Sequence, residues 1–418
     1  MKKSVRKPAI SQEVQRQLLM PVSEALRKGL MEAVFDEGLK AIATILEAER
    51  TAVCGPRYAH QPERRAVRHG HANGELVYGG SRVQLSRPRA RGAGGAELQL
   101  PSWRVFSDED PLNSRAVEQM VVGVSTRKYG RSLEPLGFEP KRRGVSKSAV
   151  SRRFVATTAA RMETWKTRSL KALDLVVLMV DGIHFAENVV LVALGIDASG
   201  AKHVLGLWEG ATENSTSCTA LMTNLRERGL NTERSILVVI DGAKALRKAV
   251  VDVFGSKALI QRCQVHKRRN VLDQLPDEKR ASTKKAMDQA YATRDVERAR
   301  RLLNNLARVL STPHPGAAAS LKEGLEETLT VMKLCLPDAL AKTLVTTNAI
   351  ENLMSTNRRV CRNVKRWRDG SMILRWLTTA AIEAESRFHR LKGHKLLPHL
   401  VAALREKDAS VDLKLESA

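Results

Sequence analysis

Two apolar runs of the sequence end in the same pair of residues, Asp-Gly. Residues 175–180 lead into Asp181, and residues 236–240 lead into Asp241. Two buried strands that lie side by side can hold a hard metal ion between the carboxylates at their ends. A third acid, Glu351, lies far downstream in a Thr-Thr-Asn-Ala-Ile-Glu segment. Together the three acids predict an Asp-Asp-Glu metal site.

The chemistry of such a site is phosphodiester transfer. Mg²⁺ or Mn²⁺ prefers oxygen ligands, so Asp181, Asp241 and Glu351 are predicted to be both the metal ligands and the catalytic residues. We expect two ions, because a pair can activate an attacking oxygen and stabilise a leaving oxygen. Asp181 would bridge both ions, while each of the other two acids would hold one. A single Asp after a strand is more often a turn or capping residue, so the pair carries the prediction.

The charge of the chain indicates the kind of partner. The 418 residues hold 70 Lys and Arg against 45 Asp and Glu, a net charge of +25. This excess favours a polyanion over a small molecule, the alternative being a merely solubilising surface. No apolar stretch reaches the roughly 20 residues that span a bilayer, and no signal peptide is apparent. The five scattered cysteines fit a reducing compartment. We expect a cytoplasmic, nucleoid-associated protein that binds double-stranded DNA and no membrane.

The elements around the first two acids have a distinctive order. In chain order we expect strands at 174–181, 189–197 and 202–208, a helix at about 213–229, a strand at 236–241, a helix at 243–253, a strand at 257–262 and a further helix. The Asp-Ala-Ser-Gly sequence at 197–200 suits a hairpin turn. Three hairpin strands followed by β-α-β-α is the order of an RNase H-like domain. There the first and fourth strands are neighbours, which would bring Asp181 and Asp241 within reach of one ion.

The remaining sequence falls into segments of different composition. The fold class that we expect is an α/β RNase H-like catalytic domain interrupted by an all-α insertion, with a mainly α N-terminal DNA-binding region that contains a small β segment. In chain order the predicted parts are a helical segment at 1–54, a small basic β-containing DNA-binding segment at 55–112, a helix-turn-helix-like DNA-binding segment at 113–170, the catalytic domain at 171–275 and 346–390, the insertion at 276–345 and a C-terminal tail at 391–418.

Two finer predictions concern the N-terminal region. Pro21 is expected to break the first helical pattern or to start a second helix. Ser125 and Ser146 could each cap and open a short helix followed by basic residues, which suits a helix-turn-helix. The alternative is that both are ordinary structural helices.

Three groups of basic residues are candidate DNA contacts. They are Lys147, Arg152 and Arg153; Lys267, Arg268 and Arg269; and Arg358, Arg359, Arg362, Lys365 and Arg366. The bases between 358 and 368 have no acid among them and would repel one another without a polyanion, which favours phosphate contact over a solvated helix face. If the helix that carries Glu351 continues through this stretch, Arg358 and Arg362 fall near the face of the acid. Trp367 could stack on a base or simply pack.

A Cys-x-x-His sequence, Cys263 to His266, follows the last predicted strand. It resembles half of a zinc site, but no second half with suitable spacing follows. A position near the active site, in a supporting or DNA-facing role, is therefore the favoured interpretation for both residues.

These motifs resemble those of bacterial insertion-sequence transposases of the Mutator-like class, a DDE type with Cys-x-x-His between the second Asp and the Glu. The resemblance covers nearly the whole chain. The segments that carry it are Val180-Asp181-Gly182, Ile240-Asp241-Gly242-Ala243-Lys244, residues 261–267 and residues 346–351. Members of the class often have a Trp in the last insertion helix, and this chain has none at 321–326.

The resemblance implies an RNase H-like domain with a helical insertion between Asp241 and Glu351, and Mg²⁺ dependence. It also implies an N-terminal region that binds terminal inverted repeats, and a homo-oligomer, at least a dimer, that acts on paired ends and target DNA. Water would be the nucleophile in cleavage and the freed 3′-OH the nucleophile in strand transfer. Two alternatives are a non-catalytic DNA-binding regulator, which the intact acids disfavour, and a metal-dependent nuclease, which the large N-terminal region disfavours.

Overall fold

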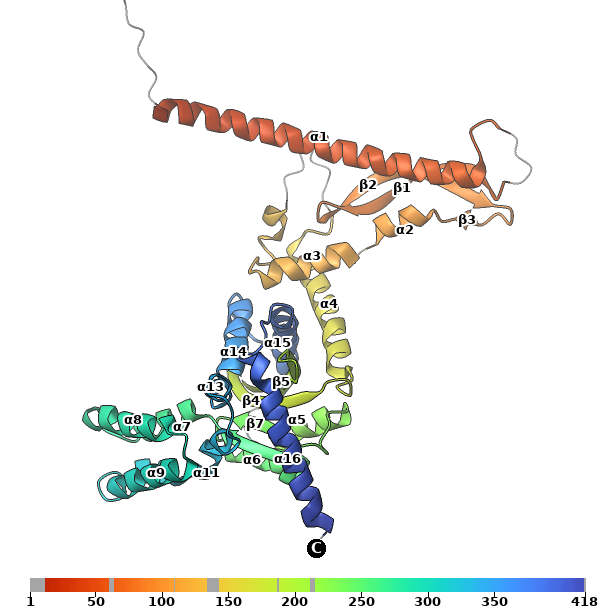
Figure 1. Cartoon of the computed structure of the whole chain (residues 1–418). Coiled ribbons are helices and arrows are strands. Elements are labelled where there is room, and N and C mark those ends of the chain that lie inside the picture. The colour runs from red at the N-terminus through yellow and green to blue at the C-terminus, as the bar shows by residue number, and fades with distance from the viewer. Residues whose placement is uncertain are drawn as a thin grey trace, which may run out of the picture. The chain divides into compact units, whose positions relative to one another are not determined.

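The computed structural model describes residues 12–59, 64–108, 110–133, 143–185, 188–210 and 215–416. The chain divides into two compact units, residues 1–157 and 158–418, and each is described by itself (Figure 1). All five cysteines are free thiols. Within the described residues, no helix combines the length and apolar character needed to cross a membrane.

The first unit begins with one long helix. The helix α1 (Gln12–Cys54) continues through Pro21, so the prediction of a break or a second helix at this proline is wrong. Residues near its C-terminal half pack on a hairpin, because Ile42 and Leu46 are buried against Leu76 and Trp103. This contact supplies tertiary packing, from which helices in proteins gain most of their stability.

The predicted small β segment is a single extended hairpin. Its strands are β1 (Ala66–Tyr78) and β2 (Ser81–Gly92), with the short β3 (Glu97–Leu98) beside β2. Gly79 and Gly80 connect the two long strands, and both have positive φ angles of 57° and 73°. Two such residues form the tight turn whose twist matches antiparallel strands, which is why glycine occupies both positions.

Helices follow the hairpin, and the last of them runs along the chain from the first unit into the second. They are α2 (Pro101–Ser107), α3 (Asp110–Val121), the 3₁₀ helix η1 (Tyr129–Ser132) and α4 (Lys147–Thr167). The predicted helix that opens at Ser125 is wrong, since residues 122–128 form turns that lead into η1. The second predicted helix is confirmed as α4, where the Ser146 hydroxyl accepts a hydrogen bond from the Ala149 amide at 3.3 Å.

The second unit contains a five-stranded sheet in the order β6-β5-β4-β7-β8. Its strands are β4 (Leu175–Phe185), β5 (Asn188–Asp197), β6 (Lys202–Gly210), β7 (Ile236–Ile240) and β8 (Ala258–Arg262). The first three form an antiparallel meander, and β7 and β8 join β4 in parallel. All five strands were predicted from the sequence, as was the pairing of the first with the fourth.

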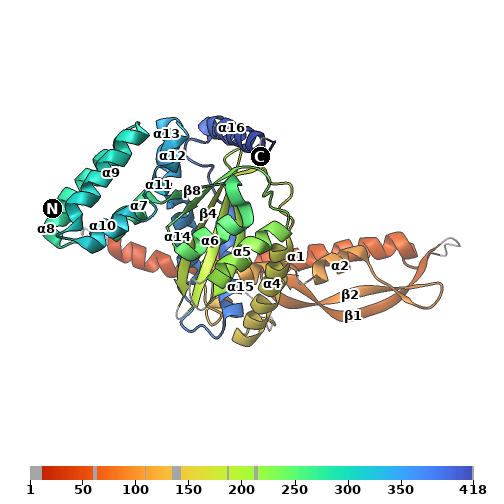
Figure 2. The ribbon, with the colours of Figure 1, turned by 90° about the horizontal axis from the view of Figure 1, so that it is seen from below.

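Helices cover both faces of this sheet. On one face, α5 (Ser215–Glu227) and α6 (Lys244–Phe254) bury Leu221 and Leu246 against Leu178 and Val180 of β4. On the other face, α14 (Asn348–Cys361) contacts β4 and β5, and α15 (Gly370–Glu385) contacts β6. Figure 2 shows the sheet between these two layers. The result is an α/β unit.

Residues 277–344 are helical throughout, as the sequence predicts. After α7 (Gln264–Leu272) the chain forms α8 (Asp277–Ala292), α9 (Val296–Ser311), α10 (Pro315–Lys322), α11 (Leu325–Thr328), α12 (Thr330–Lys333) and α13 (Asp338–Leu344). These helices have a core of their own, which includes Met287, Leu303 and Leu321. The chain ends with η3 (His394–Leu396) and α16 (Leu397–Glu416).

Candidate active site

The first two acids lie at the ends of neighbouring strands. Val180 of β4 pairs with Ile240 of β7 in parallel register, and Asp181 and Asp241 are the next residues on each side. Val180 belongs to the core beneath α5 and α6. Because side chains alternate along a strand, Asp181 faces the opposite side of the sheet, where α14 lies. The sequence predicted this adjacency correctly.

Backbone and side-chain donors hold the three carboxylates. Oδ1 of Asp181 accepts a hydrogen bond from the Gly182 amide at 2.9 Å, and Oδ1 of Asp241 accepts one from the Ala243 amide at 3.0 Å. Glu351 lies in the first turn of α14, and its Oε1 accepts a hydrogen bond from the hydroxyl of Thr347 at 2.9 Å. A carboxylate has about four lone-pair positions, so one such bond orients it and still permits metal binding.

His266 lies beside the third acid. Its Nε2 is 3.9 Å from Oε1 of Glu351. The pKa of His266 is raised to about 9, first by hydrogen bonding to Cys263, then by the negative charges of Cys263, Asp181 and Asp241, against the opposing effect of burial. The negative charges of the two strand-end acids therefore favour the protonated form of this ring.

Thr347 connects this ring to the third acid. Its hydroxyl is 2.9 Å from Oε1 of Glu351, 3.3 Å from Nδ1 of His266 and 3.4 Å from Sγ of Cys263. A hydroxyl has one proton to donate, and the shortest contact favours the carboxylate. The imidazolium Nδ1–H can then donate to the Thr347 oxygen, which gives a chain of donors from His266 to Glu351.

Cys263 connects the second strand end to the α14 helix. Its amide donates to the Ile240 carbonyl at 2.8 Å, directly before Asp241, and its sulfur accepts from the His266 amide at 3.5 Å. Burial has the largest effect on the pKa of Cys263 and raises it, but hydrogen bonds from His266 and Thr347 outweigh burial and lower the pKa overall. The Cys-x-x-His motif therefore lies beside Glu351 and beside the strand end that leads to Asp241.

The residues around Cys263 fix the helical segment to the sheet. The side-chain amide of Gln261 donates to the Thr328 carbonyl at 3.0 Å, and its oxygen accepts from the Val331 amide at 2.8 Å. Gln264 donates to the same Thr328 carbonyl at 2.9 Å. Both glutamines are buried, so these bonds satisfy groups that would otherwise destabilise the fold.

Arg262 joins the second acid's loop to the helical segment. Its side chain is 5% exposed, and Nε is 2.7 Å from Oε2 of Glu327 on α11. The same guanidinium lies against Gly242, next to Asp241, and against Gly324, where an added Cβ would be 3.1 Å and 2.2 Å away respectively. Removing one partner of a buried ion pair typically lowers the stability of the fold by about 3–5 kcal/mol.

Gly324→Ala tests this junction. Gly324 has a left-handed φ of 62°, and the new methyl group would collide with Arg262. The matched control is Gly393→Ala, because Gly393 has a φ of 83° but its added Cβ would meet only ordinary contacts from 3.4 Å. We expect the control to cost about 1–2 kcal/mol from backbone strain and Gly324→Ala to cost at least about 1 kcal/mol more. Equal midpoints in chemical denaturation would contradict the assigned packing.

Lys267 does not suit the DNA contact predicted for it. Its ammonium is buried and donates to the carbonyls of Ser320 and Glu323, each at 2.7 Å, at the end of α10. Burial is the largest influence on its pKa and lowers it. We therefore withdraw Lys267 from the DNA-binding set and assign it to holding the helical segment in place.

The other predicted basic residues lie in varied surroundings. Arg268 pairs with Asp288 at 2.8 Å, whereas the Arg269 side chain is 74% exposed. In the first unit Lys147 and Arg152 are exposed, while Arg153 donates to the Gly144 carbonyl at 2.8 Å. Exposed side chains remain suited to phosphate contact, and those that bind their own chain are less suited to it.

The basic stretch after Glu351 begins in a helix and continues in a loop. The helix α14 ends at Cys361 and therefore does not continue through the whole basic stretch. Its exposed bases are Arg358 and Arg359 in the last turn, followed in the loop by Arg362, Lys365 and Arg366. Trp367 packs edge-on against Phe185 of β4, with ring centroids 5.6 Å apart. This contact anchors the loop beside the end of the strand that carries Asp181.

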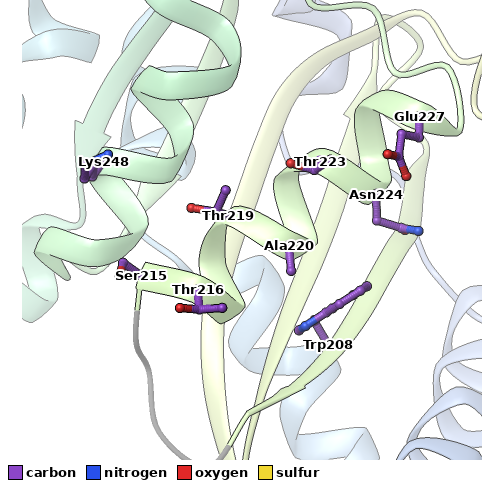
Figure 3. Close-up of a pocket in the computed structure, with 9 residues that line it drawn as sticks. All are labelled: Trp208, Ser215, Thr216, Thr219, Ala220, Thr223, Asn224, Glu227 and Lys248. Atoms are coloured by element: carbon purple, nitrogen blue, oxygen red, sulfur yellow. The ribbon is translucent and has the colours of Figure 1, made fainter.

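A surface groove of about 650 Å³ lies elsewhere in the second unit. Figure 3 shows hydroxyl-bearing residues along α5, with Trp208 beside the helix and Lys248 on α6. Trp208 packs on the core beneath α5 and α6, which is the face of the sheet opposite to Asp181. The groove is therefore separate from the three acids.

The donor set suits a hard divalent cation. Three carboxylates and no required thiolate form the chemistry that Mg²⁺ and Mn²⁺ prefer. Within the part of the chain that the structure describes, no three His, Cys, Asp or Glu side chains are close enough together to hold a metal ion as they stand. The three carboxylates fit the ion in chemical type, and binding would require the side chains to move closer together.

Two residues of this site were missed in the sequence. Thr347 directly precedes α14 and is four positions before Glu351, a spacing that places both on one helix face. Arg262 belongs to the sequence motif at residues 261–267, but no role was predicted for it. A hydroxyl residue before a helix that carries a catalytic acid is the signal that could have found Thr347, whereas the partners of Arg262 are visible only in the fold.

Two strand-end aspartates, a glutamate on a following helix and a Cys-x-x-His between them define an α/β protein with an acidic candidate active site. Residues 11–390 match the model of the family described as "Transposase, Mutator family", and the chain belongs to this family. The resemblance inferred from the motifs is thereby confirmed.

Individual relatives are transposases of insertion sequences. The chain is 26% identical over 364 residues to the transposase for insertion sequence element IS256 in transposon Tn4001 of Staphylococcus aureus, covering 84% of this chain and 87% of the relative. It is 28% identical over 403 residues to the transposase for ISRM5 of Rhizobium meliloti (strain 1021), covering 93% and 94%. The transposase for IS6120 of Mycolicibacterium smegmatis is 30% identical over 242 residues, covering 56% and 72%.

Proposed function

We propose that this chain is the DNA transposase of an insertion sequence, which binds the terminal inverted repeats and catalyses metal-dependent strand cleavage and 3′-OH strand transfer. Family membership supports the class of reaction. The observation that supports the site is the parallel pairing of β4 with β7, which ends at Asp181 and Asp241, and His266 lies 3.9 Å from Glu351. These acids are the proposed catalytic residues.

The proposed catalytic domain is RNase H-like with an all-α insertion. The sheet supports this assignment, because β4 is the first strand of an antiparallel meander and also pairs in parallel with β7, which pairs in parallel with β8. Residues 277–344 lie between the second and the third acid in the sequence, and their helices have a hydrophobic core of their own. The finer division of the N-terminal region remains as predicted from the sequence.

Asp181, Asp241 and Glu351 would hold two Mg²⁺ or Mn²⁺ ions. When bound, such ions activate the attacking oxygen and stabilise the leaving oxygen of a phosphodiester. The chain's own contribution is orientation. The Gly182 and Ala243 amides direct the two aspartates, and Thr347 directs Glu351. Cys263 and His266 keep the strand end and the helix in register.

The proposed substrate is double-stranded DNA, both the element's ends and the target. The exposed bases that follow Glu351 would contact phosphates close to the acids, because Trp367 and Phe185 hold their loop beside β4. Arg269, Lys147 and Arg152 are exposed and remain in the proposed DNA-binding set. A homo-oligomer, at least a dimer, would bring two ends together in the nucleoid of the cytoplasm.

An assay with the DNA that flanks this gene tests the proposal. The full chain is incubated with linear duplexes that carry each flank, a plasmid target and Mg²⁺, and nicks and joined products are mapped on sequencing gels. We expect nicks at fixed positions at both ends and joining of the new 3′-OH to the plasmid, both lost with EDTA. Binding without nicking would instead support a regulator of the element. Cutting that ignores the flank sequence and joins nothing would support a nuclease.

A further inference from the structure

The hairpin of the first unit has one face that is already occupied. An added Cβ on Gly74 would lie 2.4 Å from the ring of Trp103, and Leu76 is buried against the same ring. On the paired strand, the Arg87 guanidinium lies 5.3 Å from the centre of that ring. This face of β1 and β2 therefore packs on α2 and on Ile42 and Leu46 of α1.

The opposite face presents three uncharged polar side chains and one acid, Glu75, which is paired with arginines. Asn73 is paired with Ser86, and Glu75 with Gln84. Since alternate residues of a strand point to opposite faces, these two pairs point away from Trp103. Asn73, Gln84 and Ser86 are exposed, and so is His71 one pair further along. We call His71, Asn73, Gln84 and Ser86 the ribbon face.

A groove runs along part of the ribbon face. It has a volume of about 810 Å³, and His71, Ser86 and Pro88 form one wall. Thr44 and Ala48 of α1 belong to the opposite wall, together with other small or polar residues of that helix. At this end α1 partly covers the face, and Asn73 and Gln84 are exposed residues of the face that do not line the groove.

The acids beside this face are neutralised by arginines. Oε1 of Glu75 is 2.6 Å from Arg143, and its Oε2 is 3.5 Å from Arg82. Glu47 of α1 pairs with Arg50 and Arg68. The open end of the ribbon carries exposed arginines, which are Arg64, Arg65 and Arg91. The surroundings of the face are therefore net positive and suit a polyanion.

We infer that the ribbon face reads base edges in the major groove of double-stranded DNA. This inference rests on the proposed function and specifies how the N-terminal unit recognises its DNA. A major groove about 12 Å wide admits a two-stranded ribbon, whose strands are about 4.8 Å apart. Asn73 and Gln84 have amides that can pair with an adenine edge, and Ser86 can contact either kind of base pair.

The chemistry of the face distinguishes base reading from phosphate contact. Neutral amide and hydroxyl groups release no counterions, so they add little to non-specific affinity. Residues two apart on one strand face are about 7 Å apart, which matches about two base-pair steps of 3.4 Å. Asn73 and Gln84 belong to consecutive cross-strand residue pairs on the same face. They would therefore contact base pairs that lie close together in one DNA site.

Selection from a pool of random duplex oligonucleotides tests the inference. The full chain is used without divalent metal, and bound duplexes are sequenced over several rounds. We expect the wild type to enrich a motif, and Asn73→Ala and Gln84→Ala each to lose base preference at one or two of its positions. A fixed duplex of the motif should bind each variant roughly 5- to 150-fold more weakly, while a scrambled duplex binds equally well.

Two further variants make the outcome specific. Arg65→Ala should weaken binding to motif and scrambled duplexes alike and reduce the slope of log K against log salt by about one. Asn305→Ala changes an exposed amide on α9 of the other unit and should change neither measurement. All variants are exposed substitutions, and unchanged melting midpoints verify their fold.

The two possible failures are distinguishable. If the wild type enriches a motif and Asn73→Ala and Gln84→Ala enrich the same motif with the same preference at every position, the inference about the ribbon face is wrong and the proposed function stands. If the wild type enriches no motif and nicks no flanking DNA, the proposed function fails as well.

Discussion

Asp241→Asn is expected to reduce strand cleavage at DNA ends by more than about 100-fold, since residues outside the first metal shell already cost about 10- to 100-fold. Asn has the same shape and can still accept the hydrogen bond from the Ala243 amide, which is 3.0 Å from Oδ1. It lacks the negative charge that a hard cation requires from its ligand. The fold and DNA binding should therefore persist while cleavage is lost.

The same result is expected for Asp181→Asn and Glu351→Gln, measured as initial rates of nicking on flanking DNA. The matched control is Asp252→Asn on α6, because Asp252 forms a surface ion pair with Lys248. A surface pair of this kind contributes about 0–1 kcal/mol, so the control should nick at the rate of the wild type. Nicking that persists in any of the three acid variants at the control rate would remove that acid from the site.

Thr347→Val is expected to reduce cleavage by about 10- to 100-fold, the effect of losing a residue that orients a metal ligand. Valine fills the same buried volume but removes the hydroxyl between Glu351 and His266. Glu351 would then be free to adopt other rotamers, which lowers the rate of the chemical step. The free energy of unfolding should fall by only about 1 kcal/mol for one lost hydrogen bond.

Kinetic and melting measurements together distinguish an effect on the orientation of Glu351 from an effect on the stability of the fold. Thr347→Val should lower the single-turnover rate constant with little change in the affinity for DNA, whereas a merely structural residue would move the melting midpoint without this kinetic effect. Thr343→Val is the matched control, because its hydroxyl bonds to the Ala339 carbonyl on the exposed side of α13. If both valine variants cleave at the same rate, Thr347 does not position Glu351.

Much of the α/β fold could be predicted because its signals are local. The apolar runs before Asp181 and Asp241 are strands in the sheet, and their parallel pairing follows from the order of the intervening elements. The turn at residues 197–200 is also as expected, and Asp197 accepts a hydrogen bond from the Ser199 amide there. Adjacent strand ends then place two of the acids together.

The environment of a charged residue could not be predicted in the same way. Lys267 looks in the sequence like its exposed neighbour Arg269, yet its ammonium is buried on carbonyls 53 and 56 positions downstream. Arg262 likewise finds Glu327, 65 positions away. These pairings depend on how α10 and α11 return to the sheet, and hydrophobic periodicity carries no information about that path.

Helix ends were also difficult to predict. Pro21 lies inside α1 although proline removes a backbone donor, and α14 ends at Cys361 in the middle of a basic stretch. Residues 321–326 end α10 and supply Gly324 for the approach of Arg262. In both regions tertiary packing, and not local sequence preference, determines where the helix continues or ends.

The central claim is that the carboxylate of Asp241 binds a hard metal ion during DNA cleavage. Its most direct test is the nicking rate of Asp241→Cys on flanking DNA in Mg²⁺ and in Mn²⁺. A thiolate is a poor ligand for Mg²⁺ and a better one for Mn²⁺. We predict that the variant is inactive in Mg²⁺ and regains nicking in Mn²⁺, while Asp252→Cys is active in both. Equal nicking by Asp241→Cys with either metal would contradict the claim.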